Sequence, residues 1–395
     1  MPFDSVALFW LLLPVAAASG WLAALRGERH RRAQARQARQ RLSPHYFRGI
    51  NYLLNEQPDK AIEVFIKVLE IESEMVETHL ALGNLFRRRG EVDRAIRIHQ
   101  NLIGNRSLSD EERTLAMLEL GMDYMRAGLL DRAEELFKQL LDGGMHIRQS
   151  LKQLVDIYQQ EQDWNKAIDT ARRLEQVSGR SLHPMIAHFY CEQAEESWRQ
   201  REPARAQQFV DTALEVDPKC VRANLMAGRA AEDAGDLQSA LERYRHIEEQ
   251  DPDFLPEAMD PLLRCYRSLK RMDEFTIYLR GLAEKHNAIT PVLLLAELLA
   301  EREGIDTALE YLSGALHRRP SVRGLERLVH YALAHAEGRA RDNFLLLKEF
   351  VAKLLENKSV YRCNQCGFTG RLLHWQCPGC KNWNTVKPIH GIEGE

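Results

Sequence analysis

Residues 221–254 read VRANLMAGRAAEDAGDLQSALERYRHIEEQDPDF, and this stretch decides the fold. Its apolar residues recur every three or four positions in two runs, a spacing that predicts two amphipathic helices. Gly235 lies between the two runs, and Pro252 closes the second. The small residues Ala227, Gly228 and Ala240 stand where the two helices would cross. The stretch therefore predicts one helix pair of about 34 residues.

The same frame recurs along the chain. Eight copies begin at Leu42, Val76, Thr114, Arg148, Ala187, Val221, Pro256 and Ile289, and their spacings are 34, 38, 34, 39, 34, 35 and 33 residues. This is the tetratricopeptide pattern, in which a single helix pair cannot bury its apolar face and successive pairs stack into a superhelix. The two longest spacings predict longer loops at 107–113 and 176–184, and 324–357 is interpreted as a capping helix pair. We therefore expect an all-α tetratricopeptide-repeat superhelix of about eight to nine helix pairs over residues 42–357.

The composition agrees with a large packed core. Of 395 residues, 45% are hydrophobic and 28% are charged, which excludes intrinsic disorder and a many-pass membrane protein. The formal net charge of -3 lacks the basic excess of a dedicated nucleic-acid binder, so we expect no nucleic-acid partner.

An uncharged apolar run lies near the N-terminus. From Val6 to Leu25 the chain reads VALFWLLLPVAAASGWLAAL, which as a helix spans about 30 Å, the thickness of a bilayer core. A cleaved signal peptide is the alternative, but the preceding residues carry Asp4 and no Lys or Arg. Seven Arg residues and one Glu follow in 26–41, which by the positive-inside rule hold the remainder in the cytoplasm. The sequence predicts an N-terminal transmembrane anchor at 1–25 and an Arg-rich juxtamembrane segment at 26–41.

Two features of this N-terminal region have a second interpretation. The Arg run is explained by topology alone, although cations at this position would also meet anionic headgroups. Ala16 and Gly20 stand four residues apart, a spacing that lets two membrane helices approach closely but that also arises by chance in Ala-rich spans.

Repeat arrays of this kind bind peptides or protein segments on the surface lined by the first helix of each pair. The frame assigns six residues to that partner-binding groove: Asn84, Arg87, Arg88, Met122, Arg126 and Arg229. A solvated helix face is the alternative for each of them. Cys191, Cys220 and Cys265 fall among helical residues and are expected to be small buried hydrophobes.

The C-terminal segment 358–395 carries the chemistry. Cys363 and Cys366 form one CxxC, and Cys377 and Cys380 form a second one ten residues further on. Two such pairs on tight turns predict a tetrahedral four-thiolate metal site, for which zinc and iron are both suitable. Disulfides are disfavoured in a reducing cytoplasm, and a thioredoxin-type motif would need a single CxxC. Four aromatic residues are expected to form the small core of this module: Tyr361, Phe368, Trp375 and Trp383.

Several segments, in this order, resemble the lipopolysaccharide assembly protein B family of Gram-negative bacteria. They are LLLPVAAASGW (11–21), LGNLFRRRGEVDRAIRIHQ (82–100), AHFYCE (187–192), YRCNQCGFT (361–369), WQCPGC (375–380) and KPIHG (387–391). The resemblance implies a rubredoxin-like module in which Cys363, Cys366, Cys377 and Cys380 hold iron. The chain departs from it at Lys381, where rubredoxins carry glycine, and this keeps zinc as the alternative. A longer, more Arg-rich juxtamembrane segment is the second departure.

The resemblance also implies a function. It implies a single-pass protein of the bacterial inner membrane that lowers lipopolysaccharide synthesis by promoting degradation of the lipid A deacetylase LpxC. The protease would be the membrane-anchored metalloprotease FtsH, and other lipopolysaccharide-synthesis or membrane regulatory proteins are implied as further partners. On this interpretation the chain is an adaptor and not an enzyme, in keeping with the lack of HExxH, P-loop, GxSxG and dinucleotide-binding motifs.

Two other functional classes remain open from the residues. A rubredoxin-like centre on a docking array would serve as a membrane-tethered electron carrier, which requires a redox-active metal and an exposed sulfur. A chaperone-docking array would be expected to show a carboxylate clamp, a point that the sequence does not decide.

Overall fold

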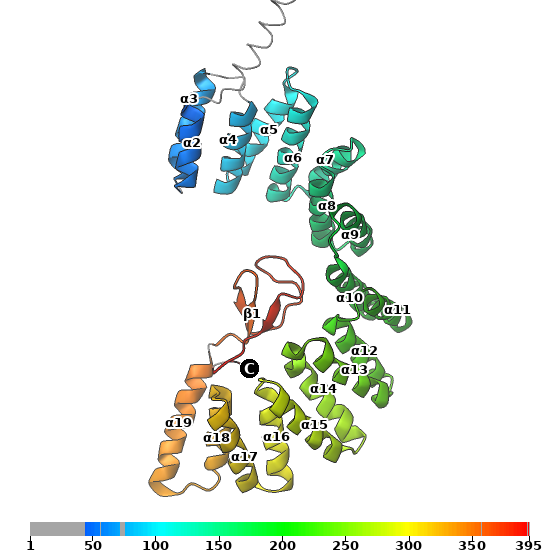
Figure 1. Cartoon of the computed structure of the whole chain (residues 1–395), viewed down its shortest axis with the longest axis vertical. Helices are drawn as coiled ribbons and strands as arrows, with labels where there is room; N and C mark the ends of the chain where they lie inside the picture. The colour runs from blue at the N-terminus through cyan, green and yellow to red at the C-terminus, as the bar shows by residue number, and fades with distance from the viewer. Residues whose placement is uncertain (1–43, 56, 72–75, 357, 393, 395) are drawn as a thin grey trace, which may run out of the picture. The chain divides into compact units, whose positions relative to one another are not determined.

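A computed structural model of the chain describes residues 44–55, 57–71, 76–356, 358–392 and 394 (Figure 1). The predicted anchor 1–25 with Ala16 and Gly20, and the Arg-rich segment 26–41, lie outside these residues. Among the residues that are described, the structure contains no helix that combines the length and the apolar character needed to cross a bilayer. The chain divides into two compact units, Met1–Gln153 and Leu154–Glu395.

The first unit consists of helix pairs. Its helices are α2 (Pro44–Leu54), α3 (Pro58–Ile71), α4 (Val76–Arg89), α5 (Val92–Gly104), α6 (Asp110–Ala127), α7 (Leu130–Asp142) and the start of α8 (Ile147–Glu161). The first helices α2, α4 and α6 each have a glycine against which a ring of the second helix packs. A Cβ added to Gly49 would lie 2.6 Å from Phe65, and one added to Gly121 would lie 2.7 Å from Phe137. The predicted crossing of helices at small residues is confirmed.

The second unit continues the repeat. Its helices are the end of α8, α9 (Trp164–Ser178), α10 (His183–Arg199), α11 (Pro203–Val216), α12 (Val221–Asp233), α13 (Leu237–Gln250), the 3-10 helix η1 (Pro252–Phe254), α14 (Leu255–Ser268), α15 (Met272–Lys285), α16 (Thr290–Arg302), α17 (Ile305–Arg318), α18 (Val322–Ala332) and α19 (Gly338–Glu356). Its largest core cluster is continuous from Val221 to Tyr331. The described residues thus contain nine helix pairs, and α18 with α19 is the expected last pair.

The prediction of longer loops at 107–113 and 176–184 was wrong in part, because much of the extra length is helical. Helix α6 has 18 residues and α10 has 17, against 14 in α4. The Ser109 side chain accepts a hydrogen bond from the Glu112 amide, and the Glu112 carboxylate accepts one from the Ser109 amide, so α6 begins earlier than its polar residues suggested. The polar residues therefore form a helix cap and first turn.

The C-terminal module is a small antiparallel sheet in the second unit. Its strands are β1 (Tyr361–Cys363), β2 (Thr369–Gly370) and β3 (Val386–Pro388), in the order β2-β1-β3. In register, Cys363 pairs with Val386 and Tyr361 pairs with both Gly370 and Pro388. The core cluster of the module consists of three buried residues, Cys363, Cys377 and Val386, which are too few to hold a fold by apolar packing alone.

Candidate metal centre

The sheet brings the four cysteines together. Cys363 ends β1 and Cys366 follows on a tight turn, closed by a hydrogen bond from the Gly367 amide to the Cys363 carbonyl. The second pair repeats this turn, with the Lys381 amide bound to the Cys377 carbonyl. Both Gly367 and Lys381 have positive φ angles, of 77° and 59°. A lysine thus adopts the left-handed conformation at the position where rubredoxins carry glycine, so the substitution leaves the turn intact.

The sulfur positions fit a tetrahedral metal ion. The Sγ atoms of Cys363 and Cys380 are 3.7 Å apart, those of Cys366 and Cys377 are 3.6 Å apart, and all four ligand atoms lie within 4.8 Å of one another. A tetrahedron with metal–sulfur bonds of about 2.3 Å has edges of about 3.8 Å, so the donor set and its size suit zinc or iron alike. A Cβ at Gly379 would lie 3.3 Å from the Cys366 sulfur, which explains glycine at this position.

The surroundings of the sulfurs favour thiolates unequally. Although desolvation opposes it, hydrogen bonds with the Thr385 hydroxyl and the Cys366 and Gln365 amides lower the pKa of the Cys363 thiol to about 6. The Phe368 amide acts in the same direction on Cys366, but desolvation and the neighbouring thiols together raise the pKa of Cys366 to about 11. Without a cation, repulsion between neighbouring thiolates prevents all four clustered cysteines from ionising together. A bound metal ion removes this conflict.

The four ligands differ in access to solvent. Cys363 and Cys377 are buried, Cys380 is half-buried and Cys366 is exposed. The remaining cysteines, Cys191, Cys220 and Cys265, are buried as expected.

Two tryptophans of the module do not form its core, so that part of the core prediction was wrong. The Trp383 ring stacks on His188 of α10 at 5.1 Å and meets the edges of Trp164 and Phe189 at 6.4 and 5.9 Å. Its indole nitrogen donates a 2.8 Å hydrogen bond to Gln159 of α8. A module held together by metal ligation does not need these large rings in its own core. The rings pack against the helices instead and attach the module to them.

Trp375 makes the second aromatic contact. It lies 5.9 Å from the His188 ring and 5.2 Å from the Phe254 ring of η1. His188 is therefore flanked by two tryptophans. Burial and the nearby Arg222 charge lower the pKa of His188 to about 3, so this histidine is neutral in the docked state.

Arg222 of α12 is buried beneath the module. Its guanidinium lies 6.0 Å from the Trp383 ring centre and pairs with Glu192 at 2.9 Å and Glu195 at 2.7 Å. Sequence reasoning missed Gln159, His188 and Arg222, because each sits in an ordinary helical pattern with no local signal of the contact.

Charge complementarity completes the docking face. From Lys358 to Ile392 the chain has five Lys and Arg residues and no Asp or Glu. The acidic partners lie between α13 and η1, on η1 and on α14. Lys387 pairs with Asp251, the His390 ring nitrogen lies 3.0 Å from Asp253, and the Tyr361 hydroxyl donates to Glu257. The Lys387 ammonium also lies 4.0 Å from the centre of the Phe254 ring.

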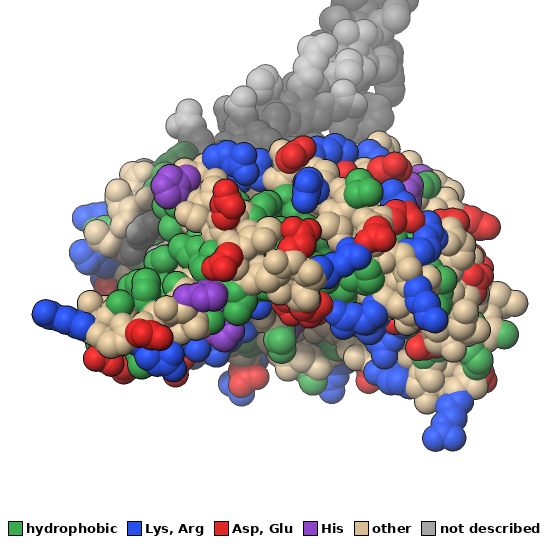
Figure 2. Space-filling view, turned by 90° about the horizontal axis from the view of Figure 1, so that it is seen from below, with side chains coloured by type: hydrophobic (Ala, Val, Ile, Leu, Met, Phe, Trp, Pro, Cys, Tyr) green, Lys and Arg blue, Asp and Glu red, His purple; other side chains and the backbone are tan. Residues whose placement is uncertain are grey.

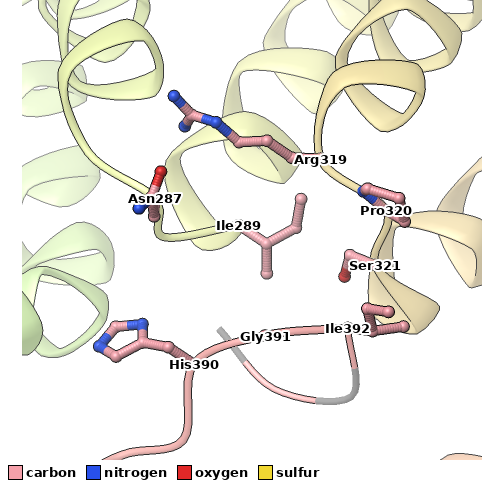
Figure 3. A pocket seen from close by; sticks show the side chains of 8 residues that line it. All are labelled: Asn287, Ile289, Arg319, Pro320, Ser321, His390, Gly391 and Ile392. Carbon is pink, nitrogen blue, oxygen red and sulfur yellow. The ribbon is translucent and has the colours of Figure 1, made fainter.

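The chain after β3 reaches two inter-repeat loops (Figure 3). The Ile392 carbonyl accepts a 2.7 Å hydrogen bond from the Val322 amide at the start of α18. A pocket of about 390 Å³ lies between this tail and the loops, lined by Asn287, Ile289, Arg319, Pro320, Ser321, His390, Gly391 and Ile392. The Arg319 guanidinium donates to the carbonyls of Ala283 and His286.

The six groove candidates differ in their surroundings. Arg87 bonds Asp123 at 2.8 Å and Glu119 at 2.7 Å, so its side chain links α4 to α6. Asn84 and Met122 are half-buried, whereas Arg88 and Arg126 are exposed. These five lie in the first unit, and the exposed Arg229 lies on α12 in the second. Arg229 therefore belongs to a different unit from the other five candidates.

This fold and site define a tetratricopeptide-repeat protein with a C-terminal rubredoxin-like metal module. Residues 361–388 match the family described as rubredoxin metal binding domain, and residues 78–114 and 191–253 match tetratricopeptide repeats. The chain belongs to the lipopolysaccharide assembly protein B family. It is 40% identical to lipopolysaccharide assembly protein B of Escherichia coli (strain K12) over 388 residues, 98% of this chain and 99% of the relative.

Two further proteins are similar to this chain. Lipopolysaccharide assembly protein B of Haemophilus influenzae is 36% identical over 397 residues, which cover 98% of this chain and 99% of that protein. Among solved structures, the C-terminal part of a repeat-containing protein from Cytophaga hutchinsonii aligns with a TM-score of 0.39 at 15% identity, covering 67% of this chain and 98% of that one.

Proposed function

We propose that this chain is an adaptor of lipopolysaccharide assembly, held at the inner membrane by residues 1–25 with the repeats in the cytoplasm. The name of its relatives supports the pathway, and the repeats support protein binding. Tethering a binding array to the membrane raises its effective concentration toward other membrane proteins without adding a contact. The adaptor's task is to bring LpxC to FtsH for degradation.

The repeats are the proposed site of partner binding. On the first unit, Arg88 and Arg126 occupy equivalent positions 38 residues apart, and both side chains are exposed. Asn84 and Met122 lie one turn earlier on the same helices. Arg87 serves as a positioning residue through Glu119 and Asp123. On the second unit, the exposed Arg229 is the proposed contact residue.

The metal module is proposed to brace the second unit. The observation that carries this role is its attachment to helices of several repeats at once, through Gln159, His188, Arg222 and Phe254. A metal ion, proposed here to be iron, ties the two CxxC turns together, and a full set of four thiolates leaves no open position for catalysis. The aromatic and charged residues of the module then fix the spacing of the helices that they contact.

The test is the half-life of LpxC in cells that lack the chromosomal copy of this gene, contain FtsH and carry a plasmid copy of the wild type or a variant. We expect rapid turnover with wild type and persistence with the double variant Arg88→Glu, Arg126→Glu. Arg97→Glu on the second helix α5 is the control, because it reverses the charge of one exposed arginine outside the first helices, and it is compared with Arg88→Glu and Arg126→Glu made singly as well as together. An unchanged LpxC half-life when the protein is absent would overturn the adaptor proposal.

The exposed Cys366 favours one second candidate, an electron carrier. Metal analysis and a redox titration of the purified protein distinguish the two. A reversible one-electron potential would support electron transfer, and zinc would exclude it because zinc has no redox chemistry.

A further inference from the structure

Helix α19 ends the array with an uncovered apolar face. Of the fifteen exposed large hydrophobic residues in the described part of the chain, five belong to α19: Leu345 (48%), Leu346 (52%), Leu347 (36%), Phe350 (54%) and Leu354 (58%). Its opposite side packs on α18 and contains Val351, which is only 2% exposed. Figure 2, seen from below, shows hydrophobic side chains gathered at the left, the side on which α19 lies in Figure 1.

This face has the character of a helix-packing surface. In the earlier pairs, the second helix packs against the first helix of the next pair, as α13 does on α14, α15 on α16 and α17 on α18. Among the residues that the structure describes after α19, the elements are the three strands of the metal module. Terminal helices of repeat arrays usually have a polar outer face for solubility, so exposed leucines and a phenylalanine here indicate a missing helix.

The pattern on α19 is self-complementary. Leu346, Phe350 and Leu354 are spaced by four residues and form one stripe that is symmetric about Phe350. An antiparallel second α19 with its two-fold axis at Phe350 would place Leu346 of each copy against Leu354 of the other. Both apolar stripes are then buried in one closed contact. A head-to-tail arrangement would instead leave one stripe exposed at the end of each assembly.

The charges beside the stripe fit the same arrangement. Glu349 and Lys353 lie on one flank, where they form a 2.7 Å ion pair within the helix. In an antiparallel two-fold pair each flank meets the same flank of the other copy, so a flank of one sign would repel itself. This flank carries both signs close to the axis, and each Glu349 can meet Lys353 of the other chain.

We propose that the protein is a homodimer in which α19 pairs antiparallel with α19 of a second copy around Phe350. One assembly then carries two repeat arrays and two metal modules. This inference goes beyond the adaptor function and does not depend on which proteins the repeats bind.

The test is the protein mass of the full chain in detergent by light scattering after size exclusion. We expect the mass of two copies for the wild type and of one copy for Phe350→Glu, which places two carboxylates at the axis. Leu345→Glu is the matched control: it is similarly exposed on the same helix, but it points about 140° away from Phe350, and it should leave two copies. An equimolar mixture of Phe350→Glu and Phe350→Lys should restore the two-copy mass.

Because Phe350 is half-exposed, its variants should keep the helical circular dichroism and melting temperature of the wild type, which separates loss of pairing from unfolding. A single-copy wild type at micromolar concentration would overturn the proposal and point to a helix of another protein as the occupant. A two-copy Phe350→Glu variant would also overturn it and would place the contact elsewhere in the chain.

Discussion

The indole nitrogen of Trp383 donates a hydrogen bond of 2.8 Å to the side-chain oxygen of Gln159, a residue 224 positions earlier in the chain. The same oxygen accepts a second hydrogen bond, of 3.2 Å, from the Gln376 amide. One helical glutamine thus serves two donors of the metal module. This contact attaches the C-terminal module to the part of α8 that belongs to the second unit.

Gln159→Leu should weaken docking of the module. The substitution keeps the volume but removes the acceptor of the partly buried Trp383 indole nitrogen and one of the two acceptors of the Gln376 amide, which should weaken docking by about 1–3 kcal/mol. Hydrogen exchange of the amides of β1 and β3 should then become about 5- to 100-fold faster. Gln160→Leu, on the exposed neighbouring position, is the control and should leave exchange unchanged. Equal exchange in wild type and Gln159→Leu would show that the aromatic contacts alone hold the module.

Docking should weaken in acid because of His188. Its pKa is about 3 in the folded protein and 6.5 in the unfolded chain, so below pH 6.5 the unfolded state binds a proton that the folded state does not. The contribution of His188 to the free energy of unfolding is therefore fully present above pH 6.5. It decreases by about 1.4 kcal/mol per pH unit as the pH falls toward 3.

His188→Phe provides the comparison. It keeps a ring between Trp375 and Trp383 but cannot be protonated, and the Nδ1 atom that it removes has no protein partner among the described residues. Between pH 7.5 and pH 5.5, we expect the melting temperature of the variant to decrease less than that of the wild type. Parallel pH profiles of the two proteins would contradict a neutral buried His188.

The sequence predicted the helix pairs well because their determinants are local and periodic. Gly49, Gly121 and Gly228 each accept a ring from the following helix, and their spacing was visible without a structure. The cysteine tetrad was visible for the same reason. The docking face was not, because Gln159, His188 and Trp383 come from distant positions and only the tertiary fold brings them together. The tryptophans were misassigned to the module core since an aromatic residue in a small domain gives no sign of which surface it covers.

Removing the metal should release the module while leaving the repeats helical. In the double variant Cys363→Ser, Cys366→Ser, only a minimal core around Cys377 and Val386 remains, and this is too small to fold alone. We expect nearly unchanged far-ultraviolet circular dichroism, fast exchange throughout 361–388 and newly unprotected amides around Phe254. Unchanged partner binding by this variant would contradict the proposal that the module braces the array.

The ion pair between Lys387 and Asp251 should contribute to docking in a charge-specific manner. Both side chains are mostly buried, at 13% and 25% exposure. Lys387→Glu places two carboxylates together and should destabilise the docked state by roughly 3 kcal/mol. Asp251→Lys combined with Lys387→Glu restores opposite charges and should recover much of the hydrogen-exchange protection. A double variant no better than Lys387→Glu would assign the effect to the loss of the Lys387 contact with the Phe254 ring.

The first unit contains a polar substitute for an aromatic contact. His99 packs on Gly83 in the position that Phe65 and Phe137 occupy on Gly49 and Gly121 in the neighbouring repeats. Its Nδ1 atom lies 2.6 Å from the fully buried Asp123, which Arg87 also contacts at 2.8 Å. A carboxylate of the third repeat therefore joins two helices of the second.

Asp123→Leu should lower the free energy of unfolding by about 3–5 kcal/mol, because it leaves His99 and Arg87 without their buried partner. Adding His99→Phe should recover a large part of this loss, since the ring then packs as Phe137 does and Arg87 keeps Glu119 as a partner. Urea unfolding of the full chain, followed by circular dichroism, measures both. If Asp123→Leu unfolded at the same urea concentration as the wild type, the buried network would have no net effect on stability. If the double variant were less stable than Asp123→Leu, His99 would stabilise this repeat independently of its carboxylate.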